Sequence, residues 1–186
     1  MDIDLVVAVA PVLVFALILL YLSVRVVRQD EKMVVFRLGR TSPSMVREPG
    51  LRFLIPIIDR PVKVDVREQF IEVPSQTHIT KDSMPVAVAF LVYWRIVDPL
   101  KSVLSVVDFQ VALEGVATTT MRAVIGALLF EDVLAKREEI GDDLRSELDH
   151  TTENWGGTVT RVEIRELLPP REFEERLIDK RLRERR

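Results

Sequence analysis

Hydrophobic residues follow three patterns along the chain: an unbroken apolar run, then alternation, then the spacing typical of helices. The unbroken run is Leu5–Val24, twenty residues without a charged side chain. A helix of that length extends about 30 Å, the thickness of the hydrocarbon core of a bilayer. Asp2 and Asp4 precede the run, and residues 21–24 make a poor cleavage site. The pattern therefore predicts a retained membrane anchor and not a cleaved signal peptide.

The expected anchor covers residues 1–28, and two membrane geometries remain open for it. Pro11 falls inside the apolar run, where it frees a backbone carbonyl and favours a kink. The kink either bends a helix that spans the bilayer once or helps a shallow hairpin that enters and leaves on one side. An amphipathic ring near the end of the run can rest among lipid headgroups. The residues expected in the membrane are Leu5, Pro11, Phe15, Leu20 and Tyr21.

Basic residues follow the apolar run, whereas only acidic residues precede it. Arg25, Arg28 and Lys32 come directly after the run. By the positive-inside rule, this asymmetry places the main domain on the cytoplasmic face of the cell membrane. Residues 25–60 contain eight basic and four acidic side chains, a balance that suits contact with anionic lipids. An ordinary solvated surface explains the same composition, and placement of the domain outside the cytoplasm remains the rival orientation.

Alternating and β-rich segments fill residues 29–98, which we expect to form a sheet-rich half of the main domain. Glu31–Arg40 has a short β-rich core that ends in a glycine turn, and Val62–Val73 alternates until Pro74 ends it. Met84–Val97 is rich in β-branched and aromatic residues and is apolar on both faces. Such a run is typical of a strand in the middle of a sheet.

Helical spacing begins after Asp98 and dominates residues 99–169, the expected second half. Pro99 suits the first position of a helix capped by Asp98. Gly156 and Gly157 end the second long helix, and Thr158–Ile164 alternates again as a strand. Apolar residues mark the first long helix at 113, 116, 117, 121, 124 and 128, and the second at 140, 144, 148 and 155.

The segment 170–186 follows a break at Pro169-Pro170 and has the composition of a charged helix. Phe173, Leu177 and Leu182 form a stripe too thin to stabilise this helix alone, so we expect it to join subunits. A frayed, solvated chain end is the alternative. Interleaved acids leave the segment with a net charge of only +2, which is too weak for a nucleic-acid surface.

Composition and motif searches predict neither an enzyme nor a metal or cofactor site. A net charge of −3 gives no reason to expect nucleic acid as a partner, and the absence of cysteine excludes disulfides and thiol catalysis. His78 and His150 are far apart in sequence, and neither lies in a cluster of metal-ligand type. Acidic pairs at 138–139 and 142–143 lie on an exposed helix face, whereas catalytic carboxylates converge in a cleft. We therefore expect no catalytic, cofactor-binding or metal-binding residues.

Several short motifs occur in an order that resembles the stomatin branch of the stomatin/prohibitin/flotillin (SPFH, band 7) superfamily, over residues 25–170. No one of them is decisive, but together they are specific. They are FRLGR at Phe36–Arg40, PGL at Pro49–Leu51, Pro56, VDVR at Val64–Arg67, TKD at Thr80–Asp82, MRAVIG at Met121–Gly126, REEI at Arg137–Ile140, WGGTVTRVEI at Trp155–Ile164, and Leu168-Pro169.

The resemblance implies an α+β protein: an N-terminal membrane helix, then a mixed α/β SPFH domain with a short C-terminal helix. It also implies a non-enzymatic homo-oligomeric scaffold, ring-shaped in some members, that organises membrane microdomains and regulates partner membrane proteins, an NfeD-type membrane protease among them. Members usually continue into a long Ala/Glu-rich helix, and this sequence stops at Arg186, which leaves the size of an assembly open. The alternative is a monomeric or dimeric adaptor that binds membrane lipids.

Overall fold

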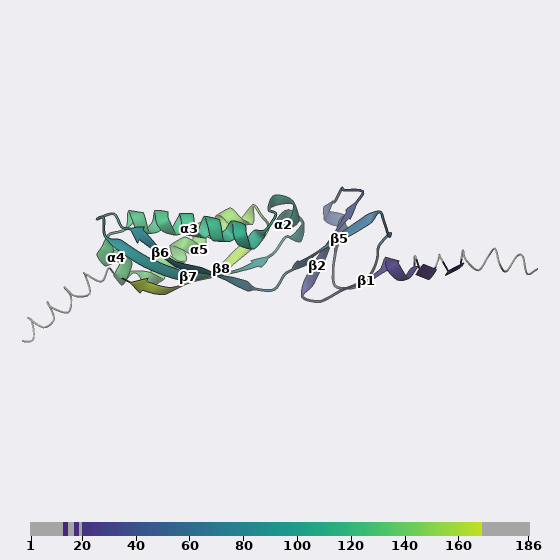
Figure 1. Cartoon of the computed structure of the whole chain (residues 1–186), viewed down its shortest axis with the longest axis horizontal. Coiled ribbons are helices and arrows are strands. Elements are labelled where there is room, and N and C mark those ends of the chain that lie inside the picture. The colour runs from purple at the N-terminus through teal and green to yellow at the C-terminus, as the bar shows by residue number, and fades with distance from the viewer. Residues whose placement is uncertain (1–12, 15–16, 19, 169–186) are drawn as a thin grey trace, which may run out of the picture. The chain divides into compact units, whose positions relative to one another are not determined.

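A computed structural model describes residues 13–14, 17–18 and 20–168 of the chain. It divides into two compact units, Met1–Arg67 and Glu68–Arg186 (Figure 1). The change to helical spacing suggested two halves of the main domain that meet between residues 98 and 99, whereas the compact units divide after Arg67. The strands β6 and β7, Gln69–Ile79 and Pro85–Ile96, therefore belong to the same unit as the helices.

The first unit is built from short strands in two small antiparallel sheets. One sheet pairs β1 with β4, and the other has the order β3-β2-β5. A hydrophobic cluster of Val27, Met33, Val35 and Leu54 lies inside this unit, and Met45 packs against it. The elements are β1 (Val24–Val27), β2 (Glu31–Arg37), the 3-10 helix η1 (Pro43–Met45), β3 (Val46–Arg47), β4 (Gly50–Phe53) and β5 (Asp59–Asp65).

The second unit is a three-stranded antiparallel sheet with helices on one face. The order β6-β7-β8 places β7 in the middle, which confirms that Met84–Val97 forms a central strand. Helices α3 and α5 run across one face of this sheet (Figure 1). Besides β6 and β7, the elements are α2 (Pro99–Ser105), α3 (Phe109–Ala127), α4 (Phe130–Ala135), α5 (Arg137–Glu153) and β8 (Gly157–Leu168).

Capping carboxylates set the starts of α2 and α3, the first of them at the Asp98 cap that the sequence predicted. Asp98 accepts hydrogen bonds from the backbone N–H groups of Leu100 and Lys101, with Pro99 as the first helical residue. Asp108 accepts in the same way from the second and third residues of α3. Each cap satisfies N–H groups that the first turn of a helix leaves without a partner.

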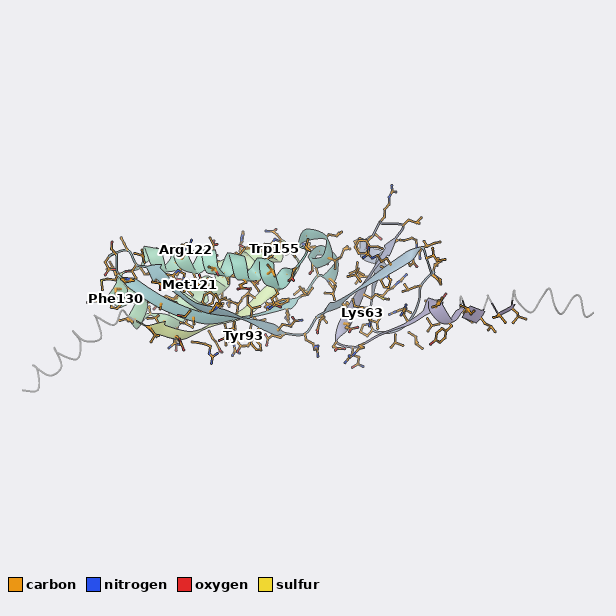
Figure 2. All side chains as sticks on the ribbon, in the orientation of Figure 1. Lys63, Tyr93, Met121, Arg122, Phe130 and Trp155 are labelled. Carbon is orange, nitrogen blue, oxygen red and sulfur yellow. The ribbon has the colours of Figure 1, made fainter. Side chains whose placement is uncertain are left out.

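The core of the second unit joins these helices to the sheet. Met121 on α3 and Leu144 on α5 are fully buried, and Figure 2 shows Met121 between its helix and the strands. Trp94 on β7 stacks on Phe109 at a centroid distance of 4.6 Å, and Trp155 meets Phe109 edge-on at 5.9 Å. Aromatic contacts of this kind stabilise beyond the area they bury.

Two sequence predictions about secondary structure are wrong in detail. The predicted strand Val62–Val73 is two strands, because β5 ends at Asp65 and β6 begins at Gln69 in the other unit. Pro74 does not end β6, because it lies at a bulge between Val73 and Gln76. A bulge on an edge strand tolerates a residue that lacks an N–H donor. The short helix α4 was not predicted.

The mixed α/β domain expected from the sequence is confirmed, but the expected membrane helix is not. Within residues 13–14, 17–18 and 20–168, no helix is both long and apolar enough to cross a bilayer. The expected anchor residues Leu5, Pro11 and Phe15 lie outside the described residues.

Candidate functional site

One face of the ribbon formed by β1 and β4 carries exposed apolar side chains. The register places Val24 opposite Phe53 and Val26 opposite Leu51, so all four side chains share this face. All four are exposed, with Phe53 reaching 71%. Val27, which follows on the other face of β1, is buried in the core of the unit. We call these four side chains the apolar face.

The loop after β4 adds a second group of exposed apolar residues, which we call the apolar tip. It consists of Leu38 and the loop residues 55–58. Ile57 is 99% exposed and Leu38 is 80% exposed, and both have a positive φ, 75° and 51°. The N–H of Leu38 donates to the carbonyl oxygen of Ile58 at 3.1 Å, which joins the two turns. A β-branched residue with positive φ is uncommon and strained.

A buried carboxylate holds the apolar tip in place. Arg37 donates from Nε to Oδ1 of Asp59 at 2.8 Å and from Nη2 to Oδ2 at 3.0 Å. The backbone N–H of Ile55 also donates to Oδ2 of Asp59, at 2.9 Å. The side chain of Asp59 is almost fully buried. The hydrogen bond from Arg37 holds the pKa of Asp59 below its usual value, because the ionised carboxylate is the better acceptor.

The apolar face begins where the uncharged run of the sequence ends. Residues 20–23 are helical and lead directly into β1 at Val24. Of the expected anchor residues that the structure describes, Leu20 and Tyr21 are both exposed. Exposed apolar groups that gather on one surface mark contact with a membrane or another protein. Exposed apolar side chains therefore occur at residues 20–22, on the apolar face and at the apolar tip.

The three basic residues expected at the membrane surface differ in their surroundings. Arg28 forms an ion pair with Asp30 at 3.2 Å, and Lys32 forms one with Glu48 at 3.2 Å. Arg25 lies directly opposite a second arginine, at position 52 on β4. Like charges in directly opposed strand positions repel, so a nearby anion would stabilise this pair. Of the three, Arg25 is therefore the residue best placed to meet a lipid phosphate.

In the second unit lies His78, one of the two histidines to which the sequence gave no site role. It is buried on β6, and its Nδ1 atom has no hydrogen-bond partner. Burial and the nearby charge of Arg122 lower its pKa, so the ring stays neutral near pH 7. In the described part of the chain, no three His, Asp or Glu side chains come together to hold a metal.

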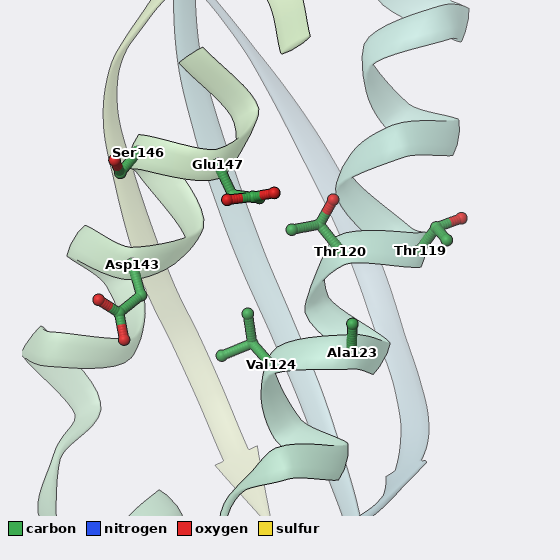
Figure 3. Close-up of a pocket in the computed structure, with 7 residues that line it drawn as sticks. All are labelled: Thr119, Thr120, Ala123, Val124, Asp143, Ser146 and Glu147. Carbon is green, nitrogen blue, oxygen red and sulfur yellow. The ribbon is translucent and has the colours of Figure 1, made fainter. Parts of the chain in front are cut away.

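An open groove of about 520 Å³ lies between α3 and α5 (Figure 3). It holds hydroxyl groups and two carboxylates, contributed by α3 and α5 alone. Its lining residues are Thr119, Thr120, Ala123, Val124, Asp143, Ser146 and Glu147.

Sequence reasoning did not single out the apolar face or the apolar tip. The signal was present, because residues 51, 53, 55 and 57 are apolar at alternate positions around Arg52 and Pro56. Only the pairing of β4 with β1 shows that two of these share a face with Val26. The residues expected to join subunits, Phe173, Leu177 and Leu182, lie outside the described residues.

Comparison with known proteins matches residues 25–186 to the family described as SPFH domain / Band 7 family. The chain is 41% identical over 159 residues to a stomatin homologue of Pyrococcus horikoshii, an alignment that covers 86% of this chain and 59% of the relative. It is 36% identical to stomatin-1 of Caenorhabditis elegans, over 83% of this chain and 46% of the relative. It is 34% identical to mouse stomatin, over 81% of this chain and 53% of the relative. The chain thus spans between about half and three-fifths of the length of these three relatives.

Proposed function

Because the chain belongs to the SPFH domain / Band 7 family, we propose that it is a membrane-anchored scaffold without enzymatic activity of its own. In this proposal the run Leu5–Val24 holds the protein to the bilayer, as a single span or a hairpin. Copies of the chain assemble into a homo-oligomer that organises the surrounding membrane. The assembly positions or restrains a partner membrane protein, with an NfeD-type membrane protease as the candidate partner.

The observation that carries the proposal is the continuity of apolar surface in the first unit. The uncharged run passes into β1, whose side chains at Val24 and Val26 share the apolar face with Leu51 and Phe53. Complete burial of one such side chain stabilises by about 1.5–3 kcal/mol. A bilayer that buries the apolar face and the apolar tip would therefore bind the protein more strongly than the anchor alone does.

The direct test compares the full chain with a chain that starts at Arg25. We expect the full chain to stay in membranes at alkaline pH and the shorter chain to wash off. Protease added to intact spheroplasts should leave the main domain uncut, because the proposal places it on the cytoplasmic face. Equal release of both chains would refute the anchor, and digestion in intact spheroplasts would reverse the orientation.

The alternative function, a monomeric or dimeric lipid-binding adaptor, is favoured by one observation. Arg25 and Arg52 face each other across β1 and β4, an arrangement that an anionic headgroup would stabilise. The mass of the detergent-solubilised full chain separates the two functions. A scaffold gives a large assembly, and an adaptor gives one or two chains.

A further inference from the structure

The basic residues of the first unit outnumber its acidic residues, and only half of them have a carboxylate partner. Residues 25–67 contain ten basic and five acidic side chains, a net charge of +5. Each of the five carboxylates forms an ion pair with a different basic side chain of the same unit, at 2.5–3.2 Å. The basic residues of this range that form no ion pair with a described carboxylate are all arginines: Arg25, Arg40, Arg47, Arg52 and Arg60.

Two of these arginines lie within the ribbon that carries the apolar face. Arg25 lies between the two residues that β1 contributes to this face, and Arg52 lies between the two from β4. Arg25 is exposed, whereas Arg52 is half-buried and donates from Nε to the carbonyl oxygen of Glu48 at 3.0 Å. The register sets the two arginines opposite each other, so their positive charges are concentrated beside the apolar face.

Two further arginines lie beside the apolar tip. Arg40 comes two residues after Leu38 and exchanges backbone hydrogen bonds with Arg37, at 2.8 and 3.0 Å. Arg60 follows the loop 55–58 at the start of β5, directly after Asp59. Both Arg40 and Arg60 are exposed. Because Arg37 already binds both carboxylate oxygens of Asp59, the charges of Arg40 and Arg60 remain available to a ligand.

Exposed apolar side chains and arginines without a carboxylate partner therefore occur together at two places, and one class of partner suits both groups. An anionic bilayer offers an acyl region to the apolar side chains and phosphates to the arginines, which bind phosphate through parallel N–H donors. Long arginine side chains reach the headgroups while their apolar neighbours enter the acyl region. A phosphate in solution would bind the arginines but leave Ile57, which is 99% exposed, in water.

We propose that the first unit binds the surface of an anionic phospholipid bilayer directly, in addition to the anchor. The apolar face and the apolar tip enter the bilayer. Arg25 and Arg52 bind lipid phosphates beside the face, and Arg40 and Arg60 bind them beside the tip. This inference rests on the membrane contact in the proposed function and names its lipid class.

The absence of cysteine from the sequence allows a probe to be placed at the apolar tip of the full chain. Ile57→Cys is labelled with a fluorophore whose emission moves to shorter wavelength in an apolar environment. The protein is reconstituted into vesicles of phosphatidylcholine alone or of an equal mixture with phosphatidylglycerol. We expect the shift only in the mixture, and high salt should weaken it by screening the charges. Leu38→Cys, labelled in the same way, should report the same shift from the other turn of the tip.

Removing the two arginines beside the tip should release the probe. Arg40→Gln combined with Arg60→Gln should lower the ratio of inserted to exposed probe in the mixed vesicles by about tenfold or more, because two charges near an anionic surface are lost. The matched control, Arg95→Gln combined with Arg145→Gln, removes two exposed arginines from the second unit and should leave the ratio unchanged. Circular dichroism should show the same fold in all variants.

Flotation of the vesicles separates this inference from the anchor. Protein that floats with both lipids but shows no shift, or the same shift in both, overturns the inference and leaves the anchor in place. A shift in phosphatidylcholine alone that grows with the protein-to-lipid ratio would assign the tip to a second copy of the chain and overturn it as well. Flotation with the mixture alone would refute the anchor and support the inference, whereas flotation with neither lipid would refute both.

Discussion

Ile57 combines two features at one residue: a fully exposed β-branched side chain and a left-handed backbone conformation. Strain of this kind costs about 1–3 kcal/mol and clusters at functional positions. Within its own unit, the side chain buries no surface that would offset this cost. In the proposed function, insertion of the apolar tip into a bilayer would bury this side chain and offset the cost.

Replacing Ile57 by Asn should raise stability and weaken membrane binding at the same time. Asn tolerates positive φ, so the free energy of unfolding should rise by about 1 kcal/mol. Loss of the apolar side chain should weaken binding to anionic vesicles by about tenfold. Urea denaturation and vesicle co-sedimentation of the chain from Arg25 measure the two effects. Val107→Asn, a matched change at another fully exposed β-branched residue, should produce neither effect. Lower stability of the Ile57 variant would contradict the strain argument.

At the scale of elements, an ion pair joins the end of β2 to the start of β5. Arg37 and Asp59 are the last pair in the register of these strands, and their side chains meet in two hydrogen bonds. Asp59 also accepts from the N–H of Ile55, so the same carboxylate connects two strands and the apolar tip. Bidentate pairs with arginine are directional as well as attractive.

Replacing Asp59 by Asn should lower stability by about 1 kcal/mol at pH 7, a modest effect because Arg37 is partly exposed. The folded state lowers the pKa of Asp59 below the ordinary 3.8. The stabilisation is therefore complete well above pH 3.8 and is lost as the pH falls through the folded pKa. Urea midpoints of both proteins should differ at pH 7 and converge in strong acid. A difference that is the same at both pH values would rule out this ion pair as its source.

At the scale of the whole molecule, the two units have separate hydrophobic cores. Met33 lies in the core of the first unit and Met121 in that of the second, and both are buried. The two tryptophans, Trp94 and Trp155, belong to the second unit. Tryptophan fluorescence therefore reports on the second unit, whereas backbone circular dichroism reports on both.

Met121→Ala should lower the urea midpoint seen by fluorescence, because a large-to-small change in a core costs about 2–5 kcal/mol. Met33→Ala, the same change in the other core, should leave the fluorescence midpoint in place and shift only the part of the dichroism signal from the first unit. An equal shift of fluorescence by both substitutions would show that the units unfold as one.

The sequence by itself determined the features that depend on neighbouring residues. The cap at Asp98, the helical spacing through Leu113, Ala117 and Met121, and the central strand through Phe90 all follow from local periodicity and side-chain chemistry. The order of the short motifs along the chain likewise indicated the family, and the match over residues 25–186 confirms it.

Only the tertiary structure decided which apolar residues are left exposed. The residue pattern of β7 indicates that both faces of this strand are apolar. It does not indicate which of the two faces the helices cover. Val26 and Leu51 share a face, and Arg37 reaches Asp59, only through strand pairing across more than twenty residues. The physical reason is that burial and charge pairing depend on distances in space, which register and packing set and local sequence does not.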